Sequence, residues 1–406
     1  MPRCRVAITG AGVICALGRN RSEVWEALRS GHSGIAPIES ADISGLRFRN
    51  GAEVRGYKSD EYFDPDRAAL LDRFTQFALI AAREALQDSG KELTSRLAES
   101  TAVITGSSVG GQSSQDDGFA DLYRLNKGRV HPLTIPRTMA NAGASLISME
   151  FGIVGPAYTI STACSSSNHA LGHAFRLVRD GEAEMAIAGG SEAPFSFGLL
   201  KAWEAMRVIS PDTCRPFCAD RRGMILGEGA AMFVLESREA ARARGARIHA
   251  EVAGFGMSAD AHHITQPSVE GPARSMRGAL RDAGLQPEQI GYINAHGTGT
   301  PGNDPCEARA IRAVFGDHAD RIAVSSTKSM HGHALGAAGA LEAFATLMAL
   351  EEGILPPTAN FTKLDPECNL DVIQNHARPD RVEYAISNSF AFGGLNAVLA
   401  FKAPAG

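Results

Sequence analysis

The chain has 406 residues and a formal net charge of −5, from 40 Lys and Arg against 45 Asp and Glu. Hydrophobic residues make up 44% of it and charged residues 21%, a balance typical of globular proteins that excludes disorder over most of the chain. The slight acidity also excludes a nucleic-acid-binding protein that relies on bulk positive charge. At about 150 residues per domain, the length predicts two or three domains or one large duplicated one.

The cysteines and the uncharged segments indicate the compartment. Seven cysteines are too few, and odd in number, for a disulfide scaffold, so we expect a protein of the reducing cytoplasm. Cys214 and Cys218 lie four apart without a second pair, so we expect no metal site. The longest segment without Asp, Glu, Lys or Arg, Phe151–Phe175, contains Ser, Thr, Asn and His side chains that a bilayer would not tolerate. We therefore expect no membrane span.

Short β-branched segments alternate with Ala-rich segments along the whole chain, which is the pattern of an α/β protein. The first apolar run follows two arginines, as in a signal peptide, but glycines interrupt it, so we interpret it as a buried strand. The expected strands are Val6–Thr9, Thr101–Thr105, Met185–Ala188, Ala231–Leu235, Ile248–Val252, Tyr292–Asn294 and Ala397–Phe401. The expected helices are Ser22–Ser30, Arg73–Ser89, Cys164–Asp180, Glu270–Ala283, Asp304–Phe315 and Gly336–Glu352.

Two pairs of similar segments indicate that the chain contains an internal duplication. GEGAAMFVLES near residue 230 resembles GGLNAVLAFK at the C-terminus, and VAITGAG at the start resembles AEVAGFG near residue 253. The composition changes most clearly after REAARARGA, where a new strand begins. We therefore expect two duplicated α/β halves, residues 1–250 and 251–406, in one compact body.

Cys164 is the first candidate for chemistry. It lies in STACSSSNHALGHAF, where an extended segment meets an expected helix. A thiol at a helix N-terminus experiences the partial positive charge of unpaired N–H groups, which lowers its pKa and favours the thiolate. A buried, inert cysteine is the alternative, and position alone does not decide between them.

Two further segments place polar or aromatic groups at turns. In NAHGTGTPGND, His296 follows an expected strand, where active sites of α/β proteins form, and the hydroxyls of Thr298 and Thr300 could bind a substrate. In SNSFAFGGLN, Phe390 and Phe392 stand before two glycines. Such a turn can present backbone N–H groups to an oxyanion while an aromatic ring controls access.

The segment SSTKSMHGHALGAAGALEAF carries four ionisable side chains, Lys328, His331, His333 and Glu342. The Gly and Ala residues that follow His333 predict a helix with very close neighbours. Glu342 within that helix therefore needs a partner, and Lys328 is the candidate.

In combination and in order, TACSSS, NAHGTGTPGND, STKSMHGHALGAAGALE and NSFAFGG resemble the β-ketoacyl-[acyl-carrier-protein] synthases of type I/II, the condensing enzymes of fatty-acid synthesis. The resemblance covers nearly the whole chain, and KAWEAMRVISPDTCRPFCADRRGMILGEGA is more similar still to nodulation-type ketosynthases. It implies a thiolase-like five-layer αβαβα fold with two duplicated halves, and a homodimer paired through a strand near the nucleophile.

The resemblance also implies a role for each matching residue. Cys164 accepts the acyl group, His296 and His333 form the histidine pair, and Lys328 and Glu342 are the active-site charges. A malonyl-carrier is decarboxylated to an enolate that attacks the acyl-cysteine. The backbone N–H groups of Cys164 and Phe392 form one oxyanion hole, and the Nε2 atoms of the neutral histidines form a second.

The His-Gly-His sequence leaves two candidates for the second histidine. We assign the role to His333 and not His331, because the catalytic histidine of the family directly follows the glycine. Phe392 matches the aromatic residue that gates the site. The other expected substrate-binding residues are Phe390, Thr298, Thr300 and Val109.

The substrates are expected to arrive on the phosphopantetheine arm of an acidic acyl carrier protein, with no other cofactor. Docking such a partner requires a basic rim near the pocket despite the net charge of −5. The expected docking residues are Arg124, Lys127 and Arg129 in YRLNKGRVHP, joined by Arg67, Arg73 and Arg207.

Three alternatives share this fold. A thiolase needs a second catalytic cysteine in the C-terminal glycine turn, which here reads AFGGLN. Initiation-type synthases use a Cys-His-Asn set, against which the second histidine argues. A non-catalytic chain-length partner subunit lacks the nucleophile, whereas Cys164 is present.

Overall fold

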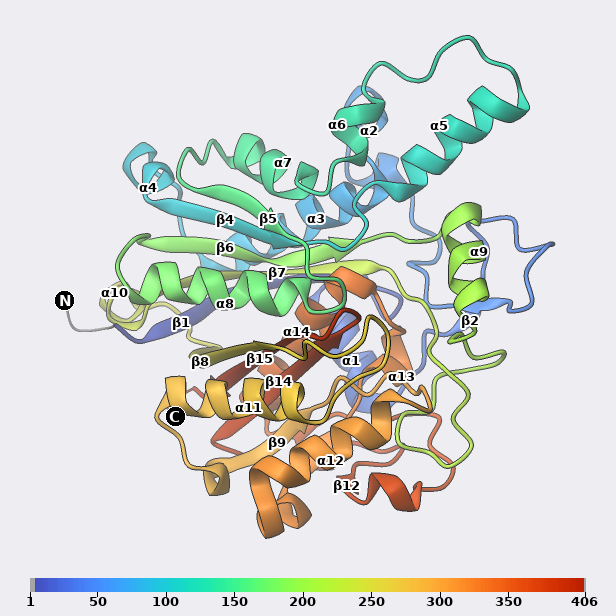
Figure 1. Ribbon diagram of the computed structural model, residues 1–406. Coiled ribbons are helices and arrows are strands. Elements are labelled where there is room, and N and C mark those ends of the chain that lie inside the picture. The colour runs from blue at the N-terminus through green and yellow to red at the C-terminus, as the bar shows by residue number, and fades with distance from the viewer. Residues whose placement is uncertain (1–3, 405–406) are drawn as a thin grey trace.

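The computed structural model describes residues 4–404 and contains one large mixed sheet surrounded and divided by helices (Figure 1). Its eleven strands are β1 Val6–Cys15, β4 Thr101–Gly106, β5 Ala157–Ile160, β6 Met185–Glu192, β7 Gly229–Ser237, β8 Ala250–Ala259, β9 Ile290–Asn294, β10 Ala323–Ser325, β12 Asp371–Val372, β14 Tyr384–Ala391 and β15 Leu395–Lys402. The main helices are α1 Arg21–Ser30, α2 Pro65–Leu70, α3 Arg73–Ser89, α5 Gln112–Arg124, α6 Thr134–Thr138, α7 Ala142–Phe151, α8 Ser166–Arg179, α9 Phe197–Met206, α10 Arg238–Ala243, α11 Glu270–Ala283, α12 Asn303–Phe315, α13 Lys328–His331 and α14 Ala338–Glu352.

The strand order repeats itself across the middle of the sheet. From edge to centre, the N-terminal strands run β5-β4-β6-β7-β1 and the C-terminal strands run β10-β9-β14-β15-β8, with β12 added at the C-terminal edge. In both groups the first three strands are parallel and the last two pairings are antiparallel. β1 and β8 join the groups through an antiparallel pairing of Val6–Ile8 with Ala250–Val252. A duplicated α/β unit accounts for this repeat, and β8 begins where we divide the sequence.

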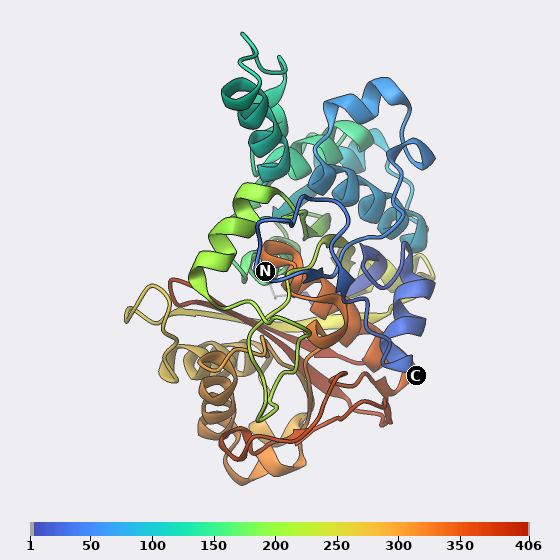
Figure 2. The same ribbon diagram turned by 90° about the vertical axis from the view of Figure 1, so that its right-hand side faces the viewer.

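The twisted sheet folds into two strand layers, with α8 and α14 between them (Figure 1). α3 and α7 cover the outer face of the N-terminal strands, and α11 and α12 cover the outer face of the C-terminal strands. This is the expected five-layer αβαβα arrangement. Figure 2 shows that α5 and the loop after it project from these layers.

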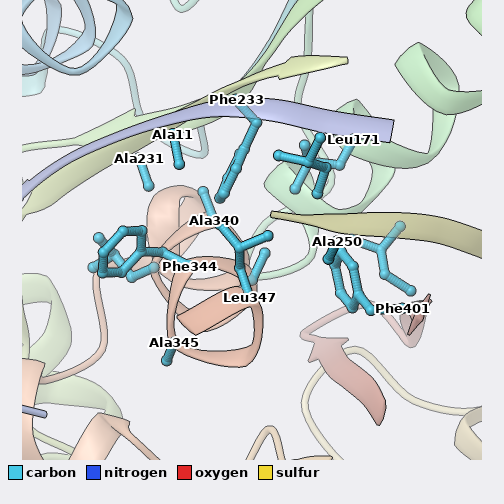
Figure 3. Packing of buried hydrophobic residues seen from close by; sticks show 14 of the residues in the cluster. Ala11, Leu171, Ala231, Phe233, Ala250, Ala340, Phe344, Ala345, Leu347 and Phe401 are labelled. Atoms are coloured by element: carbon cyan, nitrogen blue, oxygen red, sulfur yellow. The ribbon is translucent and has the colours of Figure 1, made fainter. Parts of the chain in front are cut away.

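The central helix α14 is buried along almost its whole length. Figure 3 shows Ala340, Phe344 and Leu347 of α14 packed in the same core as Ala11 of β1 and Phe233 of β7. Small Ala and Gly side chains on the helix let both strand layers approach it closely, as in other tightly packed interiors. The Gly- and Ala-rich sequence predicted this burial correctly.

All the predicted strands and helices are present; α3 and α11 have the predicted bounds, and the other elements have shifted ends. The helix expected from Cys164 begins at Ser166, so the cysteine lies in the turn before it. Strands β10, β12 and β14 of the large sheet were not predicted, although β14 carries Phe390 and leads to the glycine turn, and β5 was expected only as an extended segment before Cys164. Within residues 4–404, no helix is both long enough and apolar enough to cross a membrane.

Candidate active site

The turn that carries Cys164 is strained. The chain leaves β5 and reaches Ala163, whose φ of +51° lies in the left-handed region that non-glycine residues rarely occupy. Thr162 and Cys164 pair across this residue as an isolated bridge, and α8 starts two residues later. The sharp turn holds the sulfur between the end of a strand and the start of a helix, where it faces a pocket.

The expectation of a lowered thiol pKa is wrong. Burial raises the pKa of the Cys164 thiol to about 11, because the cysteine is almost completely excluded from water. The charge of Lys328 and the backbone N–H groups of Phe392 and Cys164 favour the thiolate but do not outweigh burial. The free thiol is therefore protonated at neutral pH. The two N–H groups are nevertheless those predicted for the first oxyanion hole, and both act on the sulfur.

The pocket unites residues from distant parts of the sequence. Its lining includes Cys164, His296, His333, Phe390 and Phe392. Thr298, Thr300, Trp203, Arg207 and Asn396 line it as well. Val109 is not among the lining residues; it packs against an apolar cluster that contains Leu335 and Met224, and of these Met224 lines the pocket.

The hydrogen bonds of His296 and His333 determine which ring nitrogen carries the proton. Lys328 Nζ lies 3.3 Å from His296 Nδ1, and the backbone N–H of Leu335 donates to His333 Nδ1 over 3.1 Å. An ammonium and an amide N–H are donors only, so both Nδ1 atoms are acceptors and both protons lie on Nε2. Burial lowers the pKa of both rings well below 6.5, and the charge of Lys328 lowers it further, so both are neutral.

The two rings lie together in the pocket. Their centroids are 5.6 Å apart with the planes nearly perpendicular. His296 directly follows β9, and His333 lies beside Leu226 in a short parallel bridge. Two neutral Nε2–H donors in one pocket with a thiol can stabilise a developing oxyanion without the cost of reorganising water.

His331 is differently placed from His333. Its Nδ1 lies 2.8 Å from the carbonyl oxygen of Gly332 and its Nε2 lies 3.0 Å from Thr327 Oγ1, so both nitrogens are occupied within the protein. It is buried and does not line the pocket. Gly332 between the histidines has a φ of +68°, a conformation that glycine adopts readily. The turn at this glycine lets the ring of His331 lie in the protein interior while the ring of His333 lines the pocket.

The expected partnership of Lys328 and Glu342 is present. Lys328 Nζ forms an ion pair with Glu342 Oε1 and also donates to the carbonyl oxygen of His296 over 2.7 Å. Both side chains are fully buried. Burial raises the pKa of Glu342 to about 7, while Lys328 opposes the rise. The lysine therefore connects the carboxylate in α14 to the ring of His296.

Phe392, the expected gate residue, and Phe390 both have aromatic partners. The ring of Phe392 stacks on Trp203 of α9 with centroids 6.2 Å apart, and Phe390 meets His296 edge-on at 5.9 Å. Gly393 and Gly394 both have positive φ, and the N–H of Gly393 donates to Ile264 O over 2.7 Å. The segment 260–267 is thus bonded to the Gly393–Gly394 turn, and both segments line the pocket.

Glu307 is a buried residue near the site that the sequence did not reveal. It accepts hydrogen bonds from the backbone N–H groups of His296 and Gly297 and from Asn388 Nδ2. These bonds fix the turn that carries His296. Its only signal in the sequence was an acidic residue in a helix that starts beside the Gly-Thr turn.

The expected docking residues are spread over several elements, and some already have partners. Lys127 pairs with Asp121 at 2.6 Å, and Arg67 pairs with Glu150. Arg73 pairs with the fully buried Glu228, and its guanidinium also lies over the rings of Tyr57 and Phe77. Arg124 lies over the ring of Phe197. Of the six, Arg207 is the one that lines the pocket, and Arg129 lies in the exposed loop after α5.

The chain matches two family models, the β-ketoacyl synthase N-terminal domain over residues 3–241 and the C-terminal domain over residues 249–362. Nodulation protein E of Rhizobium sp. (strain N33) is 48% identical over 98% of this chain and 99% of its own length. 3-Oxoacyl-[acyl-carrier-protein] synthase 2 of Coxiella burnetii is 42% identical over 98% of both chains.

Solved structures agree over the full length. The ishigamide ketosynthase/chain length factor superposes with a TM-score of 0.94 and 38% identity, over 99% of this chain and 100% of that one. A type II polyketide ketosynthase solved in complex with its acyl-carrier protein, AntDE:AntF, gives a TM-score of 0.90 and 30% identity over 100% of both chains.

Proposed function

The chain belongs to the β-ketoacyl synthase family, which makes it an acyl-transferring condensing enzyme, and we propose that it acts through Cys164, His296 and His333. The observation that carries this assignment is the pair of neutral Nε2–H donors in the pocket of a buried thiol. The product is a 3-oxoacyl thioester in fatty-acid or specialised lipid and polyketide synthesis.

In the first half-reaction, the sulfur of Cys164 attacks the carbonyl carbon of an acyl thioester. The thiol proton leaves with the departing carrier thiol, so that acyl-cysteine and free carrier are formed. The N–H groups of Cys164 and Phe392 stabilise the oxyanion of the tetrahedral intermediate. Because the thiol has a high pKa, its proton must move during this step and not before it.

In the second half-reaction, a malonyl thioester loses CO₂ and its electrons form an enolate. The Nε2–H groups of His296 and His333 donate to the enolate oxygen, since both rings are neutral and hold their protons on that atom. The enolate carbon attacks the acyl-cysteine, a carbon–carbon bond forms, and the Cys164 thiolate leaves and takes up a proton.

The carrier of both thioesters is proposed to be an acyl carrier protein with a phosphopantetheine arm. The ketosynthase AntDE bound to such a carrier supports this, because it matches this chain over its full length. Thr298 and Thr300, whose hydroxyls lie 2.9 Å apart at the pocket, can bind the arm. Arg207 supplies positive charge at the pocket, and the projecting loop after α5 carries Lys127 and Arg129.

A homodimer paired along β5 is also proposed. Within the described part of the chain, β5 is the edge strand of the large sheet, with β4 as its neighbour on one side. Its other edge can therefore pair with the same strand of a second copy. The apolar side chains of Met149, Val154 and Tyr158 are exposed beside this edge. The same strand leads to Cys164, so dimerisation would fix the turn that carries the nucleophile.

The test separates the enzyme from a chain-length partner subunit on the same fold. Purified protein is incubated with acyl-carrier and malonyl-carrier, and the acyl-enzyme, the CO₂ and the 3-oxoacyl-carrier are measured. The proposal predicts all three. A partner subunit would show neither acyl-enzyme nor CO₂ release.

A further inference from the structure

Glu192, the last residue of β6, is a buried carboxylate with an unusual environment. In the described residues it makes no ion pair. Instead, Oε1 accepts from Ser107 Oγ at 2.9 Å and from the N–H of Val109 at 3.3 Å. Oε2 accepts from the N–H groups of Ser108 at 2.7 Å and Gly336 at 2.9 Å. Four neutral donors therefore take the place of a cation.

These four donors come from two segments that are far apart in the sequence. Residues 107–109 follow β4 and lie beside the run that leads from β5 to the nucleophile, with the N–H of Ser107 bonded to Ile160 O. Gly336 belongs to the 3₁₀ turn Leu335–Ala337, directly after His333. The carboxylate thus joins the wall near the nucleophile to the turn that carries the second histidine.

Both backbone polar groups of Gly336 are hydrogen-bonded. Its N–H donates to Glu192, and its carbonyl oxygen accepts from Ser167 Oγ in α8, the helix that follows the nucleophile. A Cβ atom on Gly336 would lie 2.6 Å from Glu192 Oε2, so glycine leaves the space that the carboxylate occupies. The preceding backbone N–H, that of Leu335, is the group that donates to His333 Nδ1.

We propose that Glu192 is a positioning residue for the decarboxylation half-reaction, which it supports by fixing the turn that holds the proton of His333 on Nε2. This inference rests on the proposed function of His333. Loss of the carboxylate charge would free the Gly336 N–H, and the Leu335 N–H beside it would no longer be aimed at the ring. Acyl transfer to the cysteine uses other donors and does not need this turn.

The environment also predicts a pH dependence. The four groups that donate to the carboxylate from residues 107–109 and from the 335–337 turn are all neutral, so none of them compensates its charge. Burial accordingly raises the pKa of Glu192 to about 7, and the four donors oppose the rise. Protonation replaces an acceptor with a donor, so decarboxylation should decline as the pH falls below about 7.

The first variant is Glu192→Gln, which keeps the shape and removes the charge. An amide has one acceptor oxygen, and its NH₂ group would face at least one main-chain N–H. We expect malonyl-carrier decarboxylation to fall at least tenfold, whereas acyl-enzyme formed per chain stays within twofold of the wild type. Decarboxylation within twofold of the wild type, or equal losses in both half-reactions, would overturn the inference.

Glu236→Gln is the matched control. Glu236 of β7 is another fully buried carboxylate, but it lies far from Glu192. In the antiparallel pairing of β6 with β7, Glu236 is opposite Met185 at the start of β6, whereas Glu192 at the end of β6 is opposite Gly229. Its variant should lower the thermal unfolding temperature without changing the ratio of the two half-reactions. A wild type that performs neither half-reaction would refute the proposed function instead, and so the two failures are distinguishable.

Ser107→Ala keeps the inference testable if Glu192→Gln does not fold. It removes one donor to the carboxylate, and a carboxylate with fewer donors has a higher pKa. The midpoint of the decarboxylation profile should move to higher pH, and the profile of acyl transfer should not move. Identical decarboxylation midpoints in the wild type and this variant would overturn the inference.

Discussion

Replacing Lys328 with methionine tests the most connected side chain of the site. Lys328 Nζ pairs with Glu342, donates to His296 O at 2.7 Å and lies 3.3 Å from His296 Nδ1. Lys328→Met keeps much of the side-chain volume but removes all three interactions. It leaves a buried carboxylate without its cation and releases Nδ1 of His296, which can then carry the proton.

Two magnitudes follow from these contacts. Removing one partner of a buried ion pair costs about 3–5 kcal/mol of folding stability. Losing one aimed oxyanion donor, here His296 Nε2–H, costs about 10²–10³ in rate. The stability loss depends on pH, because without Lys328 the pKa of Glu342 rises above its value of about 7. A raised carboxyl pKa destabilises the fold increasingly as pH rises above 4.5, so the loss should be greater at pH 8 than at pH 5.

The double variant Lys328→Met/Glu342→Gln separates stability from chemistry. Neutralising the carboxylate should recover most of the lost unfolding free energy, measured by urea denaturation at pH 5 and pH 8. Malonyl-carrier decarboxylation should remain at least a hundredfold below the wild type, since His296 Nδ1 still lacks its donor. A double variant that regains both stability and decarboxylation would show that Lys328 acts only on folding and would refute this reasoning.

Three other outcomes are expected. His333→Ala should nearly abolish malonyl-carrier decarboxylation, and His331→Ala should reduce it comparatively little. The reverse pattern would show that the catalytic role belongs to His331 and that the assignment to His333 is wrong. Reversing Lys127 and Arg129 to glutamate should raise KM for carrier-bound acyl groups and weaken its salt dependence, while transfer from a small pantetheine thioester stays unchanged; equal losses would mean that the loop shapes the active site. Sedimentation should show a dimer that Val154→Arg weakens, and a single wild-type species of 42.9 kDa at micromolar concentration would contradict it.

The sequence was most informative where one pattern implied one environment. The Gly- and Ala-rich run after His333 predicted close packing, and with it the need of Glu342 for a buried cation. It could not show that Lys328 also reaches His296, because that contact depends on how β9 and α13 come together in the fold.

Three features of the site depend on three-dimensional packing and were not predictable. The helix expected at Cys164 suggested a lowered thiol pKa, but desolvation has the larger effect and raises it. Glu192 carries no motif that points to chemistry, since three of its donors come from residues 83 to 85 positions before it and the fourth from 144 positions after it in the chain. Val109, expected at the pocket, packs in a neighbouring cluster because the 107–109 segment turns toward that carboxylate.

The central claim is that one cysteine accepts the acyl group, and mass spectrometry of the acyl-enzyme tests it most directly. Wild-type protein incubated with acyl-carrier should gain one acyl mass per chain, and peptide mapping should place it on Cys164. Cys164→Ala should gain no mass and should not condense. Acylation at another residue, or condensation by Cys164→Ala at close to the wild-type rate, would contradict the account.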